Sequence, residues 1–130
     1  MTYLFAFMLA LLPVMAPADT MSASEFEAYT TGKTLFYGRG GESYGVEEYL
    51  ENRRVRWSFL DGECKDGYWY ESGPLICFVY EDRPDPQCWT FRLGARGLTA
   101  QFAGDDSSVD LYEAREKNDE MVCLGPKVGV

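Results

Sequence analysis

Gly32, Lys33 and Thr34 match the end of a phosphate-binding P-loop. In that motif, G-x-x-x-x-G-K-[ST], backbone N–H groups and the lysine hold the phosphates of a nucleotide. Here Glu27 stands where the first glycine is needed, and a strand-like run, TLFY, follows the triplet where a P-loop would open a helix. The triplet therefore does not predict a nucleotide site.

The charged residues exclude some chemistry and leave hydrolysis open. The chain has 21 Asp and Glu, 12 Lys and Arg, no His and a formal net charge of −9. Without His, His-dependent nucleophilic triads are excluded, and a negative chain repels nucleic acid. A carboxylate pair could hydrolyse a glycosidic bond, although solvated surface charge is the favoured interpretation of most acidic residues.

Glu48 and two tyrosines are the candidate ligand-facing residues. If Leu50 faces Val55 across a hairpin, Glu48 lies on the apolar face of the next strand, where burial would raise its pKa; a register shift of one residue would remove it. Tyr68 and Tyr70 alternate with a tryptophan in YWY, so one set faces away from the core. Core and cross-strand packing is favoured for them, with ligand binding as the alternative.

Two polar segments resemble a calcium-binding loop and an anion-binding site, but only weakly. Residues 61–67, DGECKDG, have Lys65 at a ligand position of a calcium loop, so we expect an acidic turn that holds Cys64. The basic cluster RRVR at 53–56 is expected to pair with Glu47 and Glu51 across strands rather than to bind an anion. We expect no cofactor and no metal.

The four cysteines indicate two disulfides rather than a zinc site, because they lack close C-x-x-C spacing and His is absent. Four cysteines allow three pairings. In the segment LICFVYEDRPDPQCWTF, placing Cys77 opposite Cys88 puts Ile76, Phe78 and Trp89 on one face and both sulfurs on the other. This hairpin favours Cys77–Cys88, which leaves Cys64–Cys123.

The elements that must position these residues are mainly strands. Ser22 and Glu25 form a capping box for a short helix at 23–31, which Gly32 would end. Turn residues then separate short β-branched and aromatic runs. The expected strands are 34–38, 44–50, 54–60, 67–71, 74–81, 87–93, 98–102, 108–113 and 120–124. They predict an all-β antiparallel meander that forms a small barrel, with a two-sheet sandwich as the alternative.

Residues 1–18 carry no charged side chain and end in Ala-Pro-Ala, which predicts a signal peptide that is cleaved to leave a single β-rich domain at 19–130. The apolar run is short for a membrane anchor and contains Pro13 and Pro17. We therefore expect export to the periplasm or outside the cell, with no membrane span after cleavage.

Six residues carry a resemblance: Gly67, Trp69, Gly73, Ile76, Cys77 and Cys88. Their pattern, G-x-W-x(3)-G-x(2)-[IL]-C followed by a second Cys and Trp, resembles small exported bacterial proteins of unknown function. The resemblance implies export and a disulfide-stapled β-meander, and it brings no catalytic residue.

The sequence favours a non-catalytic binding or interaction module of the cell envelope. The alternative is a small barrel of lipocalin type that binds an apolar ligand. An inhibitor that binds a basic exported enzyme and a carboxylate-using hydrolase are less favoured. The partner is thus a basic protein or a small ligand, and the sequence gives no indication of oligomeric state.

Overall fold

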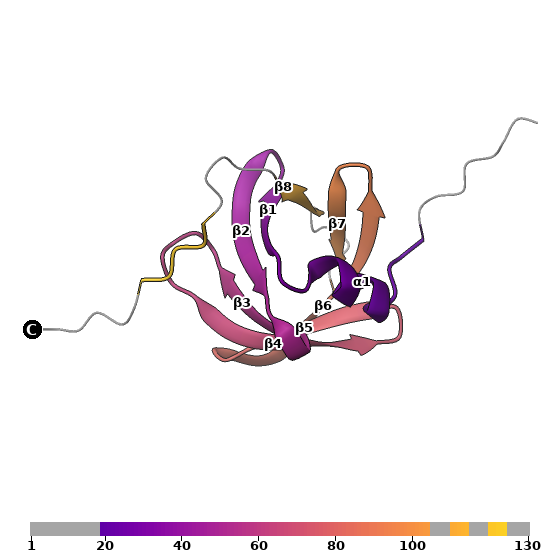
Figure 1. The fold of residues 1–130 in the computed structure, drawn as a ribbon, viewed down its shortest axis with the longest axis horizontal. Helices are drawn as coiled ribbons and strands as arrows, with labels where there is room; N and C mark the ends of the chain where they lie inside the picture. The colour runs from indigo at the N-terminus through magenta and orange to yellow at the C-terminus, as the bar shows by residue number, and fades with distance from the viewer. Residues whose placement is uncertain (1–18, 105–109, 115–119, 125–130) are drawn as a thin grey trace, which may run out of the picture.

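The computed structural model describes residues 19–104, 110–114 and 120–124. The expected signal peptide at 1–18 lies outside the described residues. Within them, eight antiparallel strands close into one barrel in chain order (Figure 1). The strands are β1 (Thr34–Arg39), β2 (Glu42–Tyr49), β3 (Arg54–Ser58), β4 (Lys65–Ser72), β5 (Leu75–Tyr80), β6 (Arg83–Gly94), β7 (Gly97–Phe102) and β8 (Leu111–Ala114).

Closure of the barrel comes from the pairing of β1 with β8, which runs from Phe36 opposite Ala114 to Arg39 opposite Leu111. A closed sheet has no unpaired edge strands, and its inward side chains form a single interior. The predicted meander barrel is confirmed, and the sandwich alternative is not observed.

A short helix, α1 (Ala23–Thr30), packs its apolar side into the barrel. The predicted capping box is present: Ser22 and Glu25 each accept a hydrogen bond from the other's backbone N–H. Phe26 is fully buried, with its ring within 6.3 Å of those of Tyr49, Trp69, Phe78 and Phe91. The helix therefore fills one end of the interior.

Gly32 follows the helix with a φ of 85°, as its predicted role requires. Its N–H donates to the carbonyl of Tyr49, and the N–H of Lys33 donates to that of Thr30. Both backbone donors are used within the fold, and the chain then enters β1. The triplet is a helix-to-strand connection.

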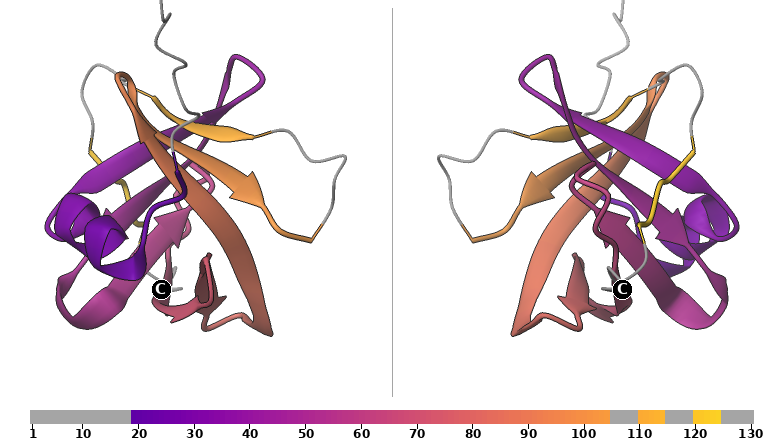
Figure 2. Two further views of the ribbon diagram at one scale, coloured as in Figure 1. Left: turned by 90° about the vertical axis from the view of Figure 1, so that its right-hand side faces the viewer. Right: turned by 90° about the vertical axis from the view of Figure 1, so that its left-hand side faces the viewer.

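Two expected elements are wrong. Residues 120–124 form no strand, although the N–H of Leu124 donates to the carbonyl of Gly62. The expected break at 83–86 belongs to the long strand β6, which spans the barrel in Figure 2. The pairing of β5 with β6 is irregular there, and such an irregularity tolerates Pro84 and Pro86, which cannot donate to a ladder.

Both predicted disulfides are present, Cys77–Cys88 and Cys64–Cys123. Cys77 and Cys88 face each other across β5 and β6 in the predicted register. Cys64 lies just before β4 and joins it to the segment at 120–124, which is a connection to an irregular segment rather than to a last strand.

Candidate functional site

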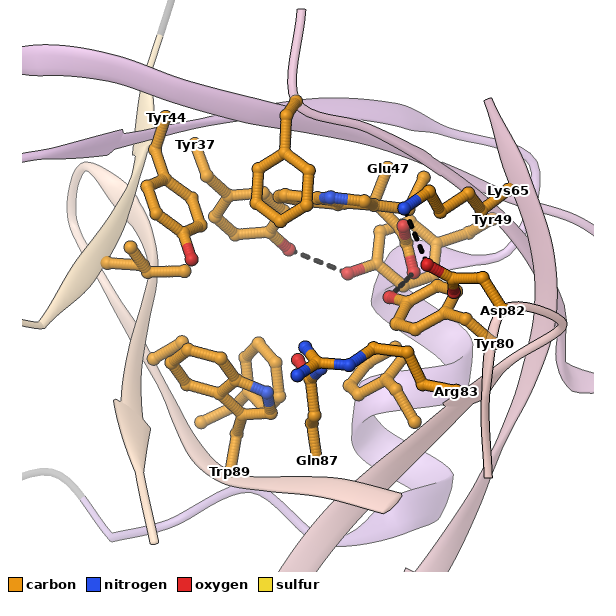
Figure 3. A pocket seen from close by; sticks show the side chains of 16 residues that line it. Tyr37, Tyr44, Glu47, Tyr49, Lys65, Tyr80, Asp82, Arg83, Gln87 and Trp89 are labelled. Atoms are coloured by element: carbon orange, nitrogen blue, oxygen red, sulfur yellow. Dashed lines mark hydrogen bonds and ion pairs between the residues drawn. The ribbon is translucent and has the colours of Figure 1, made fainter. Parts of the chain in front are cut away.

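The barrel encloses a cavity of about 200 Å³ (Figure 3). Its lining comes from all eight strands and from two loop residues, Phe59 and Asp82, so residues far apart in sequence converge on it. The lining residues are Tyr37, Tyr44, Glu47, Tyr49, Trp57, Phe59, Lys65, Phe78, Tyr80, Asp82, Arg83, Gln87, Trp89, Phe91, Ala100 and Leu111.

The floor of the cavity is apolar and closed. Tyr49, Phe78 and Phe91 line it, and each of their rings also contacts the ring of Phe26 on α1. Because Phe26 has no exposed surface, water cannot enter from this end. The end of the cavity beside Phe26 is therefore covered by the helix.

Aromatic side chains also form a wall nearer the mouth. The rings of Tyr44, Trp57 and Phe59 pack against one another with centroids 5.3–5.8 Å apart. Phe59 is 49% exposed, whereas Tyr44 and Trp57 are partly buried. Aromatic surface of this kind suits the apolar body of a small molecule.

Glu47 is the polar centre of the cavity. Its side chain is 1% exposed, and its Oε1 accepts a hydrogen bond of 2.8 Å from the hydroxyl of Tyr80. Its Oε2 has no partner among the described residues. Burial raises the pKa of the Glu47 carboxyl well above its ordinary value, against a smaller lowering by the Tyr80 hydrogen bond. The cavity thus presents a buried carboxyl group whose protonated form is favoured and whose Oε2 has no described partner.

The register of β2 and β3 places Glu47 there and corrects the expectation for Glu48. Tyr49, rather than Leu50, pairs with Val55, so Glu47 pairs with the inward Trp57 and Glu48 with the outward Arg56. The cause is the connection η1 (Glu51–Arg53), in which Asn52 and Arg53 both have positive φ. The extra residue in the turn shifts the register by one and exchanges the two faces.

Two tyrosine hydroxyls add a second polar pair. Tyr37 and Tyr49 share a buried hydrogen bond of 2.7 Å, shown dashed in Figure 3. Burial is the main cause that raises the pKa of both phenols, so both stay protonated. Two hydroxyls have two hydrogens and share only one bond between them, so one donor remains for a further acceptor.

The mouth is charged. Lys65 and Asp82 form an ion pair with a separation of 2.5 Å, which lowers the pKa of the Asp82 carboxyl. Arg83 and Gln87 also lie at the mouth, with their side chains directed over the cavity in Figure 3. A second hollow of about 390 Å³ adjoins it and shares Tyr44, Arg83, Gln87, Trp89 and Leu111.

The other predicted site residues lie outside this cavity. Tyr68 and Tyr70 are 50% and 37% exposed, on the face of β4 opposite the buried Trp69. Their role as ligand-facing residues stays a prediction for the outer surface. The basic cluster does not pair as expected, because Arg53 binds Glu27 on α1 and Arg56 binds Asp66 on β4.

Sequence reasoning missed Glu47 and Arg83. The inward face predicted for Ile76 and Phe78, continued by two residues, reaches Tyr80, so alternation along β5 is the signal that leads to the partner of Glu47. In the described part of the chain, no three His, Cys, Asp or Glu side chains gather as a metal site requires. The same part contains no helix with the length and apolarity needed to span a bilayer.

Comparison with known proteins identifies no relative of this chain. No family model matches the chain, and neither the curated proteins nor the solved structures include a significant match. The cavity is therefore the feature from which a function can be inferred.

Proposed function

We propose that this protein is an exported, non-catalytic barrel that binds a small, mainly apolar molecule in its interior. Two disulfides fit an oxidising location such as the periplasm or the outside of the cell. The hollow, aromatic interior favours the ligand-binding alternative over an interaction module that uses only its outer surface. Drug-sized ligands occupy pockets of about 300–1,000 Å³, so a cavity of about 200 Å³ suits a smaller molecule.

One observation carries the proposal: the buried Oε2 of Glu47 has no hydrogen-bond partner. An unsatisfied buried polar group costs about 1–3 kcal/mol, and most buried polar atoms in proteins have a partner. A ligand that places a hydroxyl or carbonyl oxygen beside Oε2 would remove this cost. The chemistry of the cavity therefore favours an apolar molecule with one hydrogen-bond acceptor.

A hydrolase is the weaker candidate. Asp82 is the second carboxylate that lines the cavity, but it is paired with Lys65 at the mouth. A carboxylate held in an ion pair is less available as a nucleophile or base. Nothing in the cavity favours bond cleavage over binding.

The test uses residues 19–130 and octan-1-ol, with the fluorescence of the lining residues Trp57 and Trp89 as readout. We expect saturable binding that Ala100→Leu abolishes, because Ala100 is 1% exposed and lines the cavity. Thr99→Leu is the matched control, since Thr99 is exposed on the opposite face of β7. Absence of saturable binding by the unmodified protein, or equal binding by the Ala100→Leu variant, would overturn the proposal.

A further inference from the structure

We infer that the ligand is a small amphipathic anion, whose carboxylate or similar acidic head binds Arg83 at the mouth while its apolar body enters the barrel. This inference rests on the proposed function and names the chemical class of its ligand. It depends on where Arg83 lies, on the charges around it and on the uncharged interior beneath it.

Arg83 occupies the position that a head group would meet. It is the first residue of β6, and it lines both the cavity and the adjoining hollow. Figure 3 shows its side chain extending from the rim across the mouth toward Gln87. A ligand that fills the cavity must therefore pass beside this guanidinium group.

Arg83 forms no ion pair with a described residue, although its charge contributes to the lowered pKa of the neighbouring Asp82 carboxyl. Its neighbour Asp82 is paired with Lys65 instead, and no carboxylate of the described residues lies within ion-pair distance of the Arg83 guanidinium. A guanidinium group can bind a carboxylate through two parallel hydrogen bonds, which gives it both affinity and orientation. Gln87 adds an amide donor at the same rim.

The mouth of the cavity carries charges of both signs. The lining of the two hollows contains the cations Arg39, Lys65 and Arg83 and the anions Asp82 and Asp85. Glu47 adds no charge while it is protonated. The rim thus carries Arg83 beside the Lys65–Asp82 pair, and the acidic Asp61 and Glu63 also act on Lys65. Arg83 can attract an anion at short range, against the field of a chain with a formal net charge of −9.

The interior beneath Arg83 accepts the body of such a ligand but opposes a charge. Nine of its 16 lining residues are aromatic, and an unpaired charge is costly to bury among them. An anion is best placed with its head at the solvated rim and its chain inside, and the acceptor that Oε2 of Glu47 requires is then a second polar atom on that chain. A cation would have to pass Arg83 and remove the proton of Glu47 to obtain a partner.

The experiment compares three probes with the same chain: octanoate, octan-1-ol and octylammonium. We expect the protein to bind octanoate about tenfold more tightly than octan-1-ol, as one charge-assisted hydrogen-bonded pair at an exposed rim allows. Arg83→Gln should reduce this ratio to about one. Arg54→Gln is the matched control, because it removes the same charge from the exposed outer face of β3 and should leave the ratio unchanged.

The outcomes separate the inference from the proposed function. Equal binding of octanoate and octan-1-ol overturns the anionic class and leaves the binding function intact. A preference for octylammonium also overturns it and indicates an amine that ionises Glu47. A preference for octanoate that persists in Arg83→Gln overturns the assignment to Arg83. Failure of all three probes to bind overturns the proposed function itself.

Discussion

Tyr80 of β5 donates a hydrogen bond of 2.8 Å to Oε1 of Glu47 on β2, two strands that do not pair with each other in the barrel. The bond therefore crosses the interior rather than running along the sheet. It satisfies one carboxyl oxygen and fixes the direction of the other, which has no partner in the described part of the chain. The same contact supports the barrel and shapes its cavity.

Glu47→Gln should make the protein more stable at neutral pH. The folded state raises the pKa of Glu47 above its ordinary 4.5, so above that pH the unfolded chain releases a proton that the folded chain keeps. The contribution of Glu47 to stability is complete below pH 4.5 and is lost as the pH rises to the folded pKa, with a slope of at most about 1.4 kcal/mol per pH unit. Urea unfolding of both proteins from pH 4 to pH 8 measures the difference.

The matched control is Glu48→Gln on the outward face of the same strand, opposite Arg56. That variant should lose rather than gain stability at neutral pH, because it removes a cross-strand opposite-charge pair worth about 0.2–1 kcal/mol. A difference between Glu47→Gln and the unmodified protein that stays constant with pH would contradict the buried, protonated state of Glu47.

Gly67→Ala should destabilise the barrel by roughly 3 kcal/mol through overpacking. A Cβ at Gly67 would lie 2.3 Å from the carbonyl oxygen of Val79 and 2.8 Å from the ring of Tyr80. The backbone oxygen cannot move freely, and displacement of Tyr80 would disturb its bond to Glu47. Gly94→Ala is the control, since a Cβ there meets nothing nearer than 3.9 Å. Equal midpoints of urea unfolding for the two variants would show that this close approach is absent.

Local patterns in the sequence predict the barrel well but not the polar group inside it. Alternation identified the inward sets on β5 and β6, and the opposed Cys77 and Cys88 fixed their register. No such link joins β2 to β3. There the register depends on Arg53, whose positive φ accompanies an ion pair with Glu27 and a stacking contact of 4.4 Å with Trp69. These contacts form only in the folded barrel, so the sequence placed Glu48 inside where the structure has Glu47.

Gly32→Ala should cost about 1 kcal/mol of stability, because an L-residue resists the left-handed conformation at φ 85°. A Cβ there would have no neighbour within 4 Å, so the cost is conformational rather than steric. Gly32→Asn should recover part of the loss, since Asn tolerates this region better. Thermal unfolding measures all three proteins, and an unchanged midpoint for the alanine variant would contradict this account.

The two disulfides should differ in what their removal costs. The Cys77–Cys88 loop has a sequence separation of 11 and the Cys64–Cys123 loop one of 59. The loop-entropy model gives losses of about 3 kcal/mol for the paired replacement of Cys77 and Cys88 by Ala and about 4 kcal/mol for that of Cys64 and Cys123. Guanidinium unfolding of the two double variants measures both. A larger loss from the shorter loop would show that native packing of the buried Cys77 outweighs chain entropy.

Phe26→Leu should lengthen the cavity while keeping the helix docked. The Phe26 ring supports the floor formed by Tyr49, Phe78 and Phe91, and its tilted contact with Phe91 is 4.4 Å between centroids. Full truncation to Ala would cost about 3–5 kcal/mol, whereas Leu retains most of the apolar contact. The freed volume lies at the end remote from the mouth, so the gain in affinity should grow with the length of the ligand. The affinity for decanoate should rise relative to that for octanoate, while the affinity for hexanoate should not.

Ala28→Leu, on the exposed side of α1, serves as the control. If Phe26→Leu shifted the affinities of all three acids equally, the ligand would not reach the floor, and binding would be confined to the mouth and the adjoining hollow.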